Sequence, residues 1–196
     1  MQTTIRNVLV GMAFFANSVA YAGAIGAQVT AGLHQERAYF YSQNGDQGID
    51  NQSRFNWGFG AETMIGDKDD KIQGLVRFNL IRDTPTKEPD TGEVRDPIYP
   101  PAHEQPVRNV GVLGLGIQWG LLGDPTGTQL TATSIVGSGF LTTDNTEFVL
   151  LEAGLGGTHN LNETLQLTAT LAATMRYRKH MSLGPNAYIG VRYLFD

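Results

Sequence analysis

Apolar and polar residues alternate with a period of two along most of the chain, and the alternation is longest near its carboxyl end. Between Leu165 and Tyr177, one face carries leucine, alanine and methionine, and the other carries mostly threonine. The segment from Ala187 to Phe195 repeats the pattern, with Arg192 on the polar side. A period of two places successive side chains on opposite faces of a β-strand. Runs of about ten residues or more are long enough for a strand to cross a bilayer with its apolar face toward lipid.

The same alternation, interrupted by turn-forming residues, predicts eight strands. Clusters of glycine, proline, asparagine and aspartate mark the connections between them. An even number of strands brings both ends of an up-and-down barrel to the same side. The pattern therefore predicts an all-β protein, an eight-stranded antiparallel up-and-down transmembrane β-barrel. The predicted strands cover 27–41, 53–65, 71–82, 107–121, 128–141, 146–157, 163–177 and 186–195.

The connections between the predicted strands alternate in length. Those at 66–70, 122–127 and 158–162 are short and rich in turn formers. The connections between them are mostly longer, with 83–106 the longest, although 142–145 is short. Short turns at one end and longer loops at the other are typical of outer-membrane barrels, whose turns face the periplasm.

Aromatic residues on the apolar faces gather near the predicted strand ends. Such girdles are typical of membrane barrels, because aromatic rings favour the interface between lipid and water. The predicted interface aromatics are Tyr39, Tyr41, Phe55, Trp57, Phe140 and Tyr177 at the outer end, and Trp119, Tyr193 and Phe195 at the inner end.

The first predicted strand fits the pattern least well. Gln35 and Arg37 fall on the same face as Val29 and Leu33. A β-bulge in this strand, or a strand that protrudes beyond the bilayer, would explain the mismatch.

Seven charged residues are predicted to point into the lumen of the barrel. The interior of an eight-stranded barrel is just wide enough for side chains to fill it, and opposite charges in such a space are expected to pair. We expect a network that closes the barrel; the alternative is a narrow gated pore in which the pairs rearrange. The network would contain Glu36, Glu62, Arg77, Arg108, Glu152, Arg176 and Arg192, joined by Gln73, Gln118 and Gln166.

The first 22 residues have the features of a secretory signal peptide. Arg6 supplies a positive charge, residues 8–16 are apolar except for one glycine, and Ala20-Tyr21-Ala22 is a cleavage site of small residues. The apolar run is shorter than the roughly 20 residues that a membrane-spanning helix needs. We expect residues 1–22 to be removed and residues 23–196 to form a barrel in the bacterial outer membrane.

Composition excludes several classes of protein. The chain has no cysteine, which rules out a small exported domain stapled by disulfides. Without Arg6, 13 basic residues face 19 acidic ones, a net charge of −6 that argues against a nucleic-acid partner. A hydrophobic content of 41% is too low for a helical membrane protein but suits a barrel in which half of each strand is polar.

The chain resembles the small eight-stranded outer-membrane barrels of the outer-membrane protein A and outer-membrane protein X type, over nearly all of residues 23–196. Gly190, Tyr193 and Phe195 are similar to the glycine-x-x-aromatic-x-aromatic signal that the barrel-assembly machinery recognises in this family. Asp196 departs from the family pattern, which usually ends on the aromatic residue. The resemblance implies outer-membrane lipid and lipopolysaccharide as surroundings and the assembly machinery as a partner during biogenesis. No cofactor is predicted.

Some barrels of this kind are enzymes that modify lipid A. A hydrolase would need a histidine beside a serine and a carboxylate near the lipid-facing rim. His34, His103 and His159 fall in a strand, a loop and a turn, and His180 with Ser182 is a spacing that is common by chance. We therefore predict no catalytic site and no enzyme, and keep a lipid A-modifying enzyme as an alternative.

The predicted loop 83–106 holds six of the eight prolines and six acidic residues. Proline favours a stiff, non-helical loop, and the acidic spacing lacks the pattern of an EF-hand, so no metal site is predicted. Because loops carry function more often than scaffolds do, we expect a structural, adhesive or partner-docking role through the outer loops. Residues 83–106 are the expected contact for an envelope or extracellular protein.

A soluble barrel remains an alternative from a different class. A secreted lipocalin-like protein that binds a small apolar ligand would show the same alternation with its apolar face inward. Its outer face would be dense in lysine and glutamate, whereas the polar faces here are mainly threonine, glycine, asparagine and glutamine. This composition favours the membrane barrel.

Overall fold

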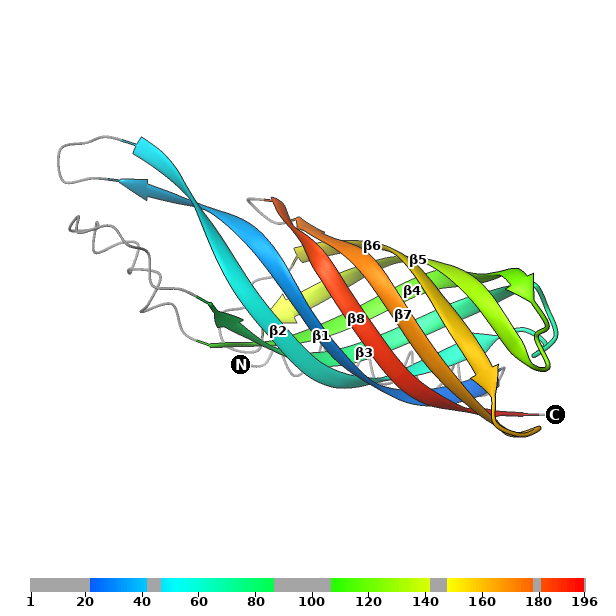
Figure 1. Ribbon diagram of the computed structural model, residues 1–196. Helices are drawn as coiled ribbons and strands as arrows, with labels where there is room; N and C mark the ends of the chain where they lie inside the picture. Colours follow the sequence, from blue (N-terminus) through cyan, green and yellow to red (C-terminus); the bar gives the residue numbers. More distant parts are fainter. Residues whose placement is uncertain (1–21, 42–46, 87–106, 142–147, 178–180, 196) are drawn as a thin grey trace.

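The computed structural model describes residues 22–41, 47–86, 107–141, 148–177 and 181–195. Eight strands, each antiparallel to its neighbours, form a closed barrel in which β1 pairs with β8 (Figure 1). The predicted eight-stranded antiparallel barrel is confirmed. The strands are β1 (Ala22–Tyr41), β2 (Gln47–Ile65), β3 (Ile72–Pro85), β4 (Arg108–Gly123), β5 (Thr128–Leu141), β6 (Phe148–Asn160), β7 (Leu165–Tyr177) and β8 (Met181–Leu194).

The described residues contain no helix that is long and apolar enough to cross a membrane.

The chain is connected at one end of the barrel by three short turns, at 66–71, 124–127 and 161–164. Ala22 and Leu194, where β1 begins and β8 ends, lie at this same end (Figure 1), and the Phe195 amide donates to the Gly23 carbonyl (2.9 Å). We call this the inner end. The predicted outer loops belong to the opposite, outer end, and most of their residues lie outside the described part of the chain.

Each inner turn is held by an acidic or amide side chain at or near its start. In the turn after β4, Asp124 Oδ1 accepts hydrogen bonds from the Thr126 amide (2.9 Å) and hydroxyl (2.8 Å). These bonds favour the ionised carboxylate and hold the pKa of Asp124 below its usual range. Asn162 accepts in the same way from the Thr164 amide (2.9 Å) and the Leu165 amide (2.8 Å). The turn formers in the sequence therefore act through local side-chain to backbone bonds.

Two predicted connections are wrong in part, because backbone pairing continues into them. Thr158 to Asn160, predicted as a turn, complete β6, and His159 Nδ1 lies 2.7 Å from the Thr128 hydroxyl. Residues 181–185, predicted as a loop, begin β8 and pair with β7. Gly184 allows β1 to approach closely there, since a Cβ atom at this position would clash with the Leu33 carbonyl oxygen.

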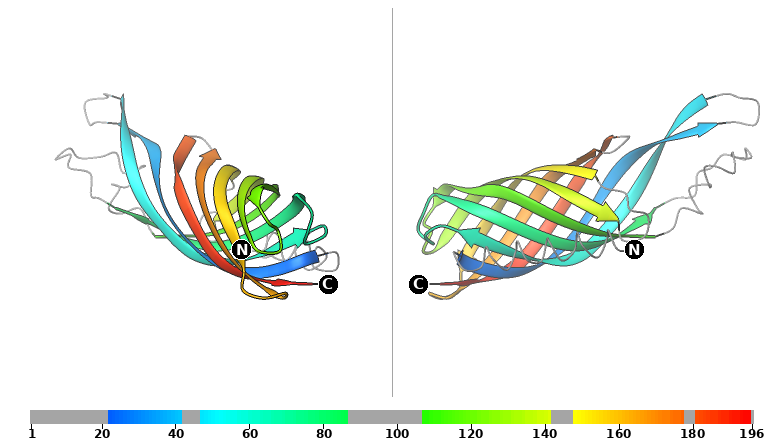
Figure 2. Two further views of the ribbon diagram at one scale, coloured as in Figure 1. Left: turned by 45° about the vertical axis from the view of Figure 1, so that its right-hand side comes forward. Right: turned by 180° about the vertical axis from the view of Figure 1, so that it is seen from behind.

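Strands β1 and β2 extend well beyond the other strands (Figures 1 and 2). The pairing of β1 with β8 ends at Glu36 and Ser182, whereas the pairing of β1 with β2 continues to Tyr41 and Gln47. We call residues 37–41 and 47–52 the β1–β2 ribbon. The register runs without a shift from Ala24 to Tyr41, so a bulge is not the reason for the mismatched pattern of this strand. The strand leaves the barrel instead.

The polarity of the barrel is the reverse of that of a soluble protein. Large apolar side chains point outward and are exposed, among them Leu155 (62%), Leu171 (64%) and Ile189 (63%). The inward positions between them carry mostly polar residues, several of them charged, such as Glu152 and Arg192. The lipocalin-like alternative is therefore wrong, since it requires the opposite orientation. A closed barrel with an apolar outer face is a transmembrane barrel, which bacteria place in the outer membrane.

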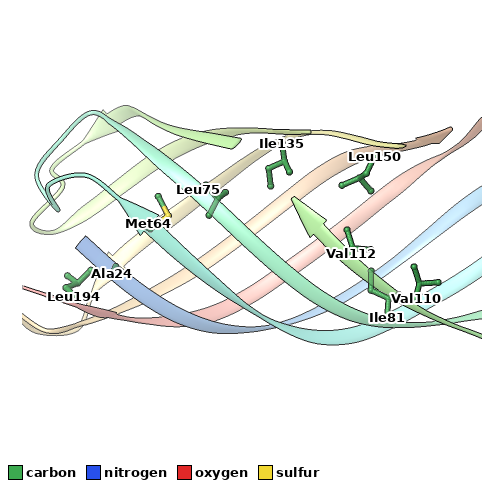
Figure 3. Packing of buried hydrophobic residues seen from close by; sticks show 9 residues of the cluster. All are labelled: Ala24, Met64, Leu75, Ile81, Val110, Val112, Ile135, Leu150 and Leu194. Carbon is green, nitrogen blue, oxygen red and sulfur yellow. The ribbon is translucent and has the colours of Figure 1, made fainter. Parts of the chain in front are cut away.

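Apolar side chains also line part of the lumen (Figure 3). Near the inner end, Leu75, Met64, Ala24 and Leu194 lie directly opposite one another on the four neighbouring strands β3, β2, β1 and β8. We call these four residues the apolar ring. A second group lies toward the outer end and on the β5 and β6 wall: Ile81, Val110, Val112, Ile135 and Leu150. Buried charged side chains, such as Glu62 and Arg77, lie between these two apolar groups.

Candidate functional site

Four charged side chains meet in the middle of the lumen, and we call them the central network. Arg192 Nε donates to Glu62 Oε1 (2.7 Å), and Arg77 Nη2 donates to Glu62 Oε2 (3.3 Å). Arg77 Nη1 also donates to Glu152 Oε1 (2.7 Å). Two guanidinium groups and two carboxylates make the network neutral. All four side chains are almost completely buried, so each charge depends on the others.

The strand register explains why these residues meet. Arg77 of β3 lies opposite Glu62 of β2, Glu62 lies opposite Gly26 of β1, and Gly26 lies opposite Arg192 of β8. Gly26 leaves space for the Arg192 side chain, because a Cβ atom at this position would lie 2.8 Å from Arg192 Cγ. Arg192 passes over the glycine and reaches Glu62 two strands away.

Neutral groups occupy the remaining hydrogen-bonding positions. Arg192 Nη1 donates to Gln166 Oε1 (3.2 Å) and Nη2 to Gln118 Oε1 (3.0 Å). The Tyr188 and Thr174 hydroxyls donate to Glu152 Oε2, and the Arg77 guanidinium lies 4.3 Å from the centre of the Tyr188 ring. The network thus joins side chains of β2, β3, β4, β6, β7 and β8 across the lumen.

A second group of charges lies closer to the outer end, and we call it the outer cluster. Its centre is Asp83, which accepts from Arg54 Nε (3.0 Å) and lies 3.5 Å from both Arg176 Nη1 and His34 Nε2. The Arg176 guanidinium also lies 5.5 Å from the centre of the Phe148 ring. Glu36 and Arg108 form a half-buried pair (3.1 Å), and Arg108 lies opposite Asp83 in the register of β3 and β4.

By the contacts between described residues, the seven predicted lumen charges fall into three groups. Glu62, Arg77, Glu152 and Arg192 form the central network, Arg176 joins the outer cluster, and Glu36 pairs with Arg108. Of the predicted glutamines, Gln118 and Gln166 contact Arg192. Gln73 does not join them: its Nε2 donates to the Asp67 carbonyl in the inner turn (2.7 Å).

Sequence reasoning missed Asp83, Arg54 and His34 as partners. Asp83 was assigned to the long loop because the predicted third strand ended at residue 82, but β3 continues to Pro85. The missed signal is the phase of the strand, since Asp83 follows Arg77 and Asn79 by steps of two residues.

The predicted interface aromatics lie in three parts of the molecule. Phe55, Trp57 and Tyr177 point outward near the outer end, and Tyr193 does so near the inner end, where its ring meets that of Phe195 edge to face at 5.3 Å. Trp119, near the inner end, is half-buried and pairs with Ile72. The backbone of Tyr39 and Tyr41 belongs to the β1–β2 ribbon; the side chains of these two residues and of Phe140 lie outside the described part.

The residues that bear on catalysis and metal binding are few in the described part of the chain. Ser182 lies in β8 and faces the lumen, 6% exposed, rather than the lipid-facing rim that a lipid A hydrolase would use; His180 lies outside the described residues. No group of three or more His, Asp or Glu side chains among the described residues could hold a metal ion. The absence of enzymatic activity stays a prediction.

Comparison with known proteins gives similarities of fold. No model of a known protein family matches the sequence. No curated protein matches it either. Among solved structures, Neisserial surface protein A is similar at 14% identity with a TM-score of 0.46, covering 88% of this chain and 99% of that one.

Two further solved structures are similar over most of the chain. A de novo designed transmembrane β-barrel has 14% identity and a TM-score of 0.43, covering 89% of this chain and 97% of the design. Ail of Yersinia pestis, solved in complex with the heparin analogue sucrose octasulfate, has 12% identity and a TM-score of 0.34, covering 87% of this chain and 99% of Ail. At these values the similarity transfers no activity or ligand to this chain.

Proposed function

We propose that this outer-membrane barrel is closed to solutes and acts through what its outer end presents, as a structural, adhesive or partner-docking protein. The observation that carries this proposal is the combination of buried ion pairs that cross the lumen with a strand pair that extends beyond the other strands. The contacts across the lumen argue against transport, and the β1–β2 ribbon offers a surface for contact with a partner.

Closure is supported by the contacts across the lumen. Arg77 reaches from β3 to Glu152 on β6, and Arg192 reaches from β8 to Gln118 on β4. The apolar ring lies nearer the inner end than the central network: Met64, Leu75 and Leu194 are each two residues along the strand from a member of the network. A solute would have to separate buried ion pairs, and leaving one charge buried without its partner costs about 3–5 kcal/mol.

The β1–β2 ribbon supports a docking role. Its backbone pairing runs from Arg37 with Asn51 to Tyr41 with Gln47. Over these residues β1 has no described pairing to β8, and β2 has none to β3. An edge of a two-stranded ribbon that no further strand covers is a template for one more strand of a partner, in which main-chain hydrogen bonds give affinity. The loop 83–106, which starts at the same end, remains a second proposed contact, and residues 87–106 lie outside the described part.

The experiment compares capture of envelope and extracellular proteins by the full-length barrel and two shortened variants. One variant replaces residues 38–50 with a two-residue Asn-Gly turn, and the other removes residues 84–105. Thr126→Ala in an inner turn is the control. We expect one shortened variant to lose the captured partner while all variants remain folded in the outer membrane. Capture unchanged by both deletions would contradict docking at the outer end.

A narrow gated pore is the second candidate, and one feature of the central network favours it. Glu62 accepts from both Arg77 and Arg192, and Arg77 also donates to Glu152, so the pairs could exchange without leaving a charge alone. Planar-bilayer recordings of the purified protein separate the two candidates. Unitary conductance would establish the pore and refute closure.

We also propose that residues 1–22 are a signal peptide and that Gly190, Tyr193 and Phe195 form the assembly signal. Cleavage after Ala22 would leave the bond between the Phe195 amide and the Gly23 carbonyl intact. The mass of the mature protein tests the first proposal. Reduced outer-membrane assembly of Phe195→Ala, with normal assembly of Leu161→Ala, tests the second proposal.

We further propose that the protein is not an enzyme. Lipid A mass spectra from expressing and deleted cells test this, and spectra that differ would contradict it.

A further inference from the structure

The lipid-facing side of the barrel carries one charge that its apolar pattern does not explain. Among the outward-pointing strand residues whose side chains the structure describes, Arg82 is the only lysine, arginine, aspartate or glutamate. It is exposed, while the next inward residue, Asp83, is buried in the outer cluster. An arginine on the lipid face destabilises a barrel unless it lies near the interface, where the penalty falls to almost nothing. Arg82 therefore marks an interfacial position.

The register places Arg82 at the outer end. It pairs with Trp57 of β2 on one side and with Asn109 of β4 on the other. The next step of the β3–β4 ladder, Asp83 with Arg108, is its last. The start of β1 and the end of β8 lie at the opposite, periplasmic end of the barrel. Arg82 therefore lies at the level of the outer-leaflet headgroups.

A groove of about 290 Å³ opens on the lipid face beside this arginine. Trp57 (49% exposed), Phe59 (60%) and Leu80 (40%) supply apolar walls, and Arg82 and Asn109 lie toward the outer end of the groove. The groove thus runs from a cation and an amide at headgroup level to apolar side chains at acyl-chain level. This order matches the order of groups in a lipid with an anionic head.

We propose that this groove binds one molecule of a phosphorylated, acylated glycolipid of the outer leaflet, of the lipopolysaccharide class. Arg82 binds a phosphate of the headgroup, because a guanidinium matches phosphate geometry with two parallel hydrogen bonds. Trp57 packs at the interface beside it, and an acyl chain lies over Phe59 and Leu80. The assignment to the outer leaflet rests on the placement of the barrel in the outer membrane. The preference for a phosphorylated lipid rests on Arg82 and the groove beside it.

The test is native mass spectrometry of the full-length barrel in mild detergent, titrated with lipid A that carries its phosphates or with the same lipid after dephosphorylation. Arg82→Gln removes the charge, Arg82→Lys keeps it without the planar fork, and Lys71→Gln is the matched control, because it removes an exposed cation at the inner end. Every variant is first shown to be folded by its heat-dependent shift on gels.

We expect wild type and Lys71→Gln to bind phosphorylated lipid A at least about tenfold more tightly than the dephosphorylated lipid. Arg82→Gln should lose that preference, and Arg82→Lys should keep part of it. Equal binding of both lipids by wild type, or an unchanged preference in Arg82→Gln, would overturn the proposal. Inorganic phosphate at millimolar concentration should not displace the lipid; complete displacement would show a simple anion site and overturn it as well.

This experiment stands apart from the proposed docking function. Loss of the lipid preference leaves capture of partners by the β1–β2 ribbon untouched. Conversely, finding that the barrel conducts, or that it captures no partner, does not change the result expected in the lipid-binding test.

Discussion

Replacing Glu62 with glutamine tests the central network most sharply, because it keeps the shape of the side chain and removes one charge. Glu62 is 2% exposed and accepts from Arg192 Nε (2.7 Å) and from Arg77 Nη2 (3.3 Å). In Glu62→Gln, Arg77 keeps the Glu152 carboxylate at 2.7 Å. Arg192 keeps only the neutral amides of Gln118 and Gln166.

The expected loss of unfolding free energy comes from the Arg192 guanidinium, which is left without a carboxylate partner. Removing one partner of a buried ion pair costs about 3–5 kcal/mol, chiefly because the other charge stays buried without compensation. We expect Glu62→Gln to lower the free energy of unfolding by about this amount. Removing both partners in Glu62→Gln/Arg192→Met leaves the neutral Arg77–Glu152 pair, so the double variant should be more stable than Glu62→Gln alone.

The assay is urea unfolding of the barrel in lipid vesicles, followed by tryptophan fluorescence. The two tryptophans, Trp57 and Trp119, are both on the apolar outer face, so their emission shifts when the barrel leaves the bilayer. Glu163→Gln, which makes the same chemical change in the exposed turn after β6, is the control and should shift the midpoint very little.

Two results would refute this reasoning. One is a cost for Glu62→Gln below about 1 kcal/mol, which is the range of an exposed pair. The other is a double variant that is less stable than Glu62→Gln, since the Arg192 charge would then not be the source of the penalty.

Three further predictions test other parts of the structure. Gly26→Val should cost about 1–3 kcal/mol in the same unfolding assay, because its Cβ atom would crowd Arg192 Cγ (2.8 Å) and the Val191 carbonyl oxygen (2.9 Å); stability equal to wild type would show that Arg192 does not need this space. Leu171→Arg, mid-strand in β7, should cost about 2–4 kcal/mol, whereas Val149→Arg near the outer end of β6 should cost at most about 1 kcal/mol, and equal costs would contradict the membrane depth assigned to them. Because the pKa of Asp124 is lowered in the folded barrel, its carboxylate stabilises the fold above its unfolded pKa of about 3.9, and this contribution is lost as the pH falls through the lower folded value. The urea midpoints of wild type and Thr126→Val should therefore differ at pH 6 and converge near pH 2, and a constant difference would show that the bond to the carboxylate is not responsible.

The sequence predicts a strand of the barrel well where one face of the strand contacts lipid and the other faces the lumen. Strand β7, predicted over 163–177, is found at Leu165–Tyr177, since lipid on one face and a packed lumen on the other impose a strict period of two. The sequence predicts residues 37–41 of the β1–β2 ribbon as the end of the first strand, but it places residues 47–52 in the loop that follows, whereas they belong to β2. Outside the bilayer neither face is constrained, and pairing continues there without an alternating pattern.

The lumen contacts were predictable in kind but not in detail. The phase of each strand points Glu62, Arg77 and Arg192 inward, yet a single strand does not reveal which residue of its neighbour lies opposite. The bond between Arg77 and Glu152 joins residues 75 positions apart and depends on the stagger of all the strands around the closed barrel. The role of Gly26 likewise follows from its place between Glu62 and Arg192, and nothing in its own neighbourhood along the chain indicates it.

The central claim is a closed barrel with lipid outside and packed side chains inside, and spin-label accessibility along β7 tests it most directly. The chain has no cysteine, so each introduced cysteine from Leu167 to Thr174 carries the only label. In bilayers, labels at the odd positions should be accessible to oxygen, which concentrates in lipid. Labels at the even positions should be reached by neither oxygen nor a water-soluble nickel complex. Access of the nickel complex to the even positions would show a water-filled lumen, and loss of the two-residue period would contradict the barrel itself.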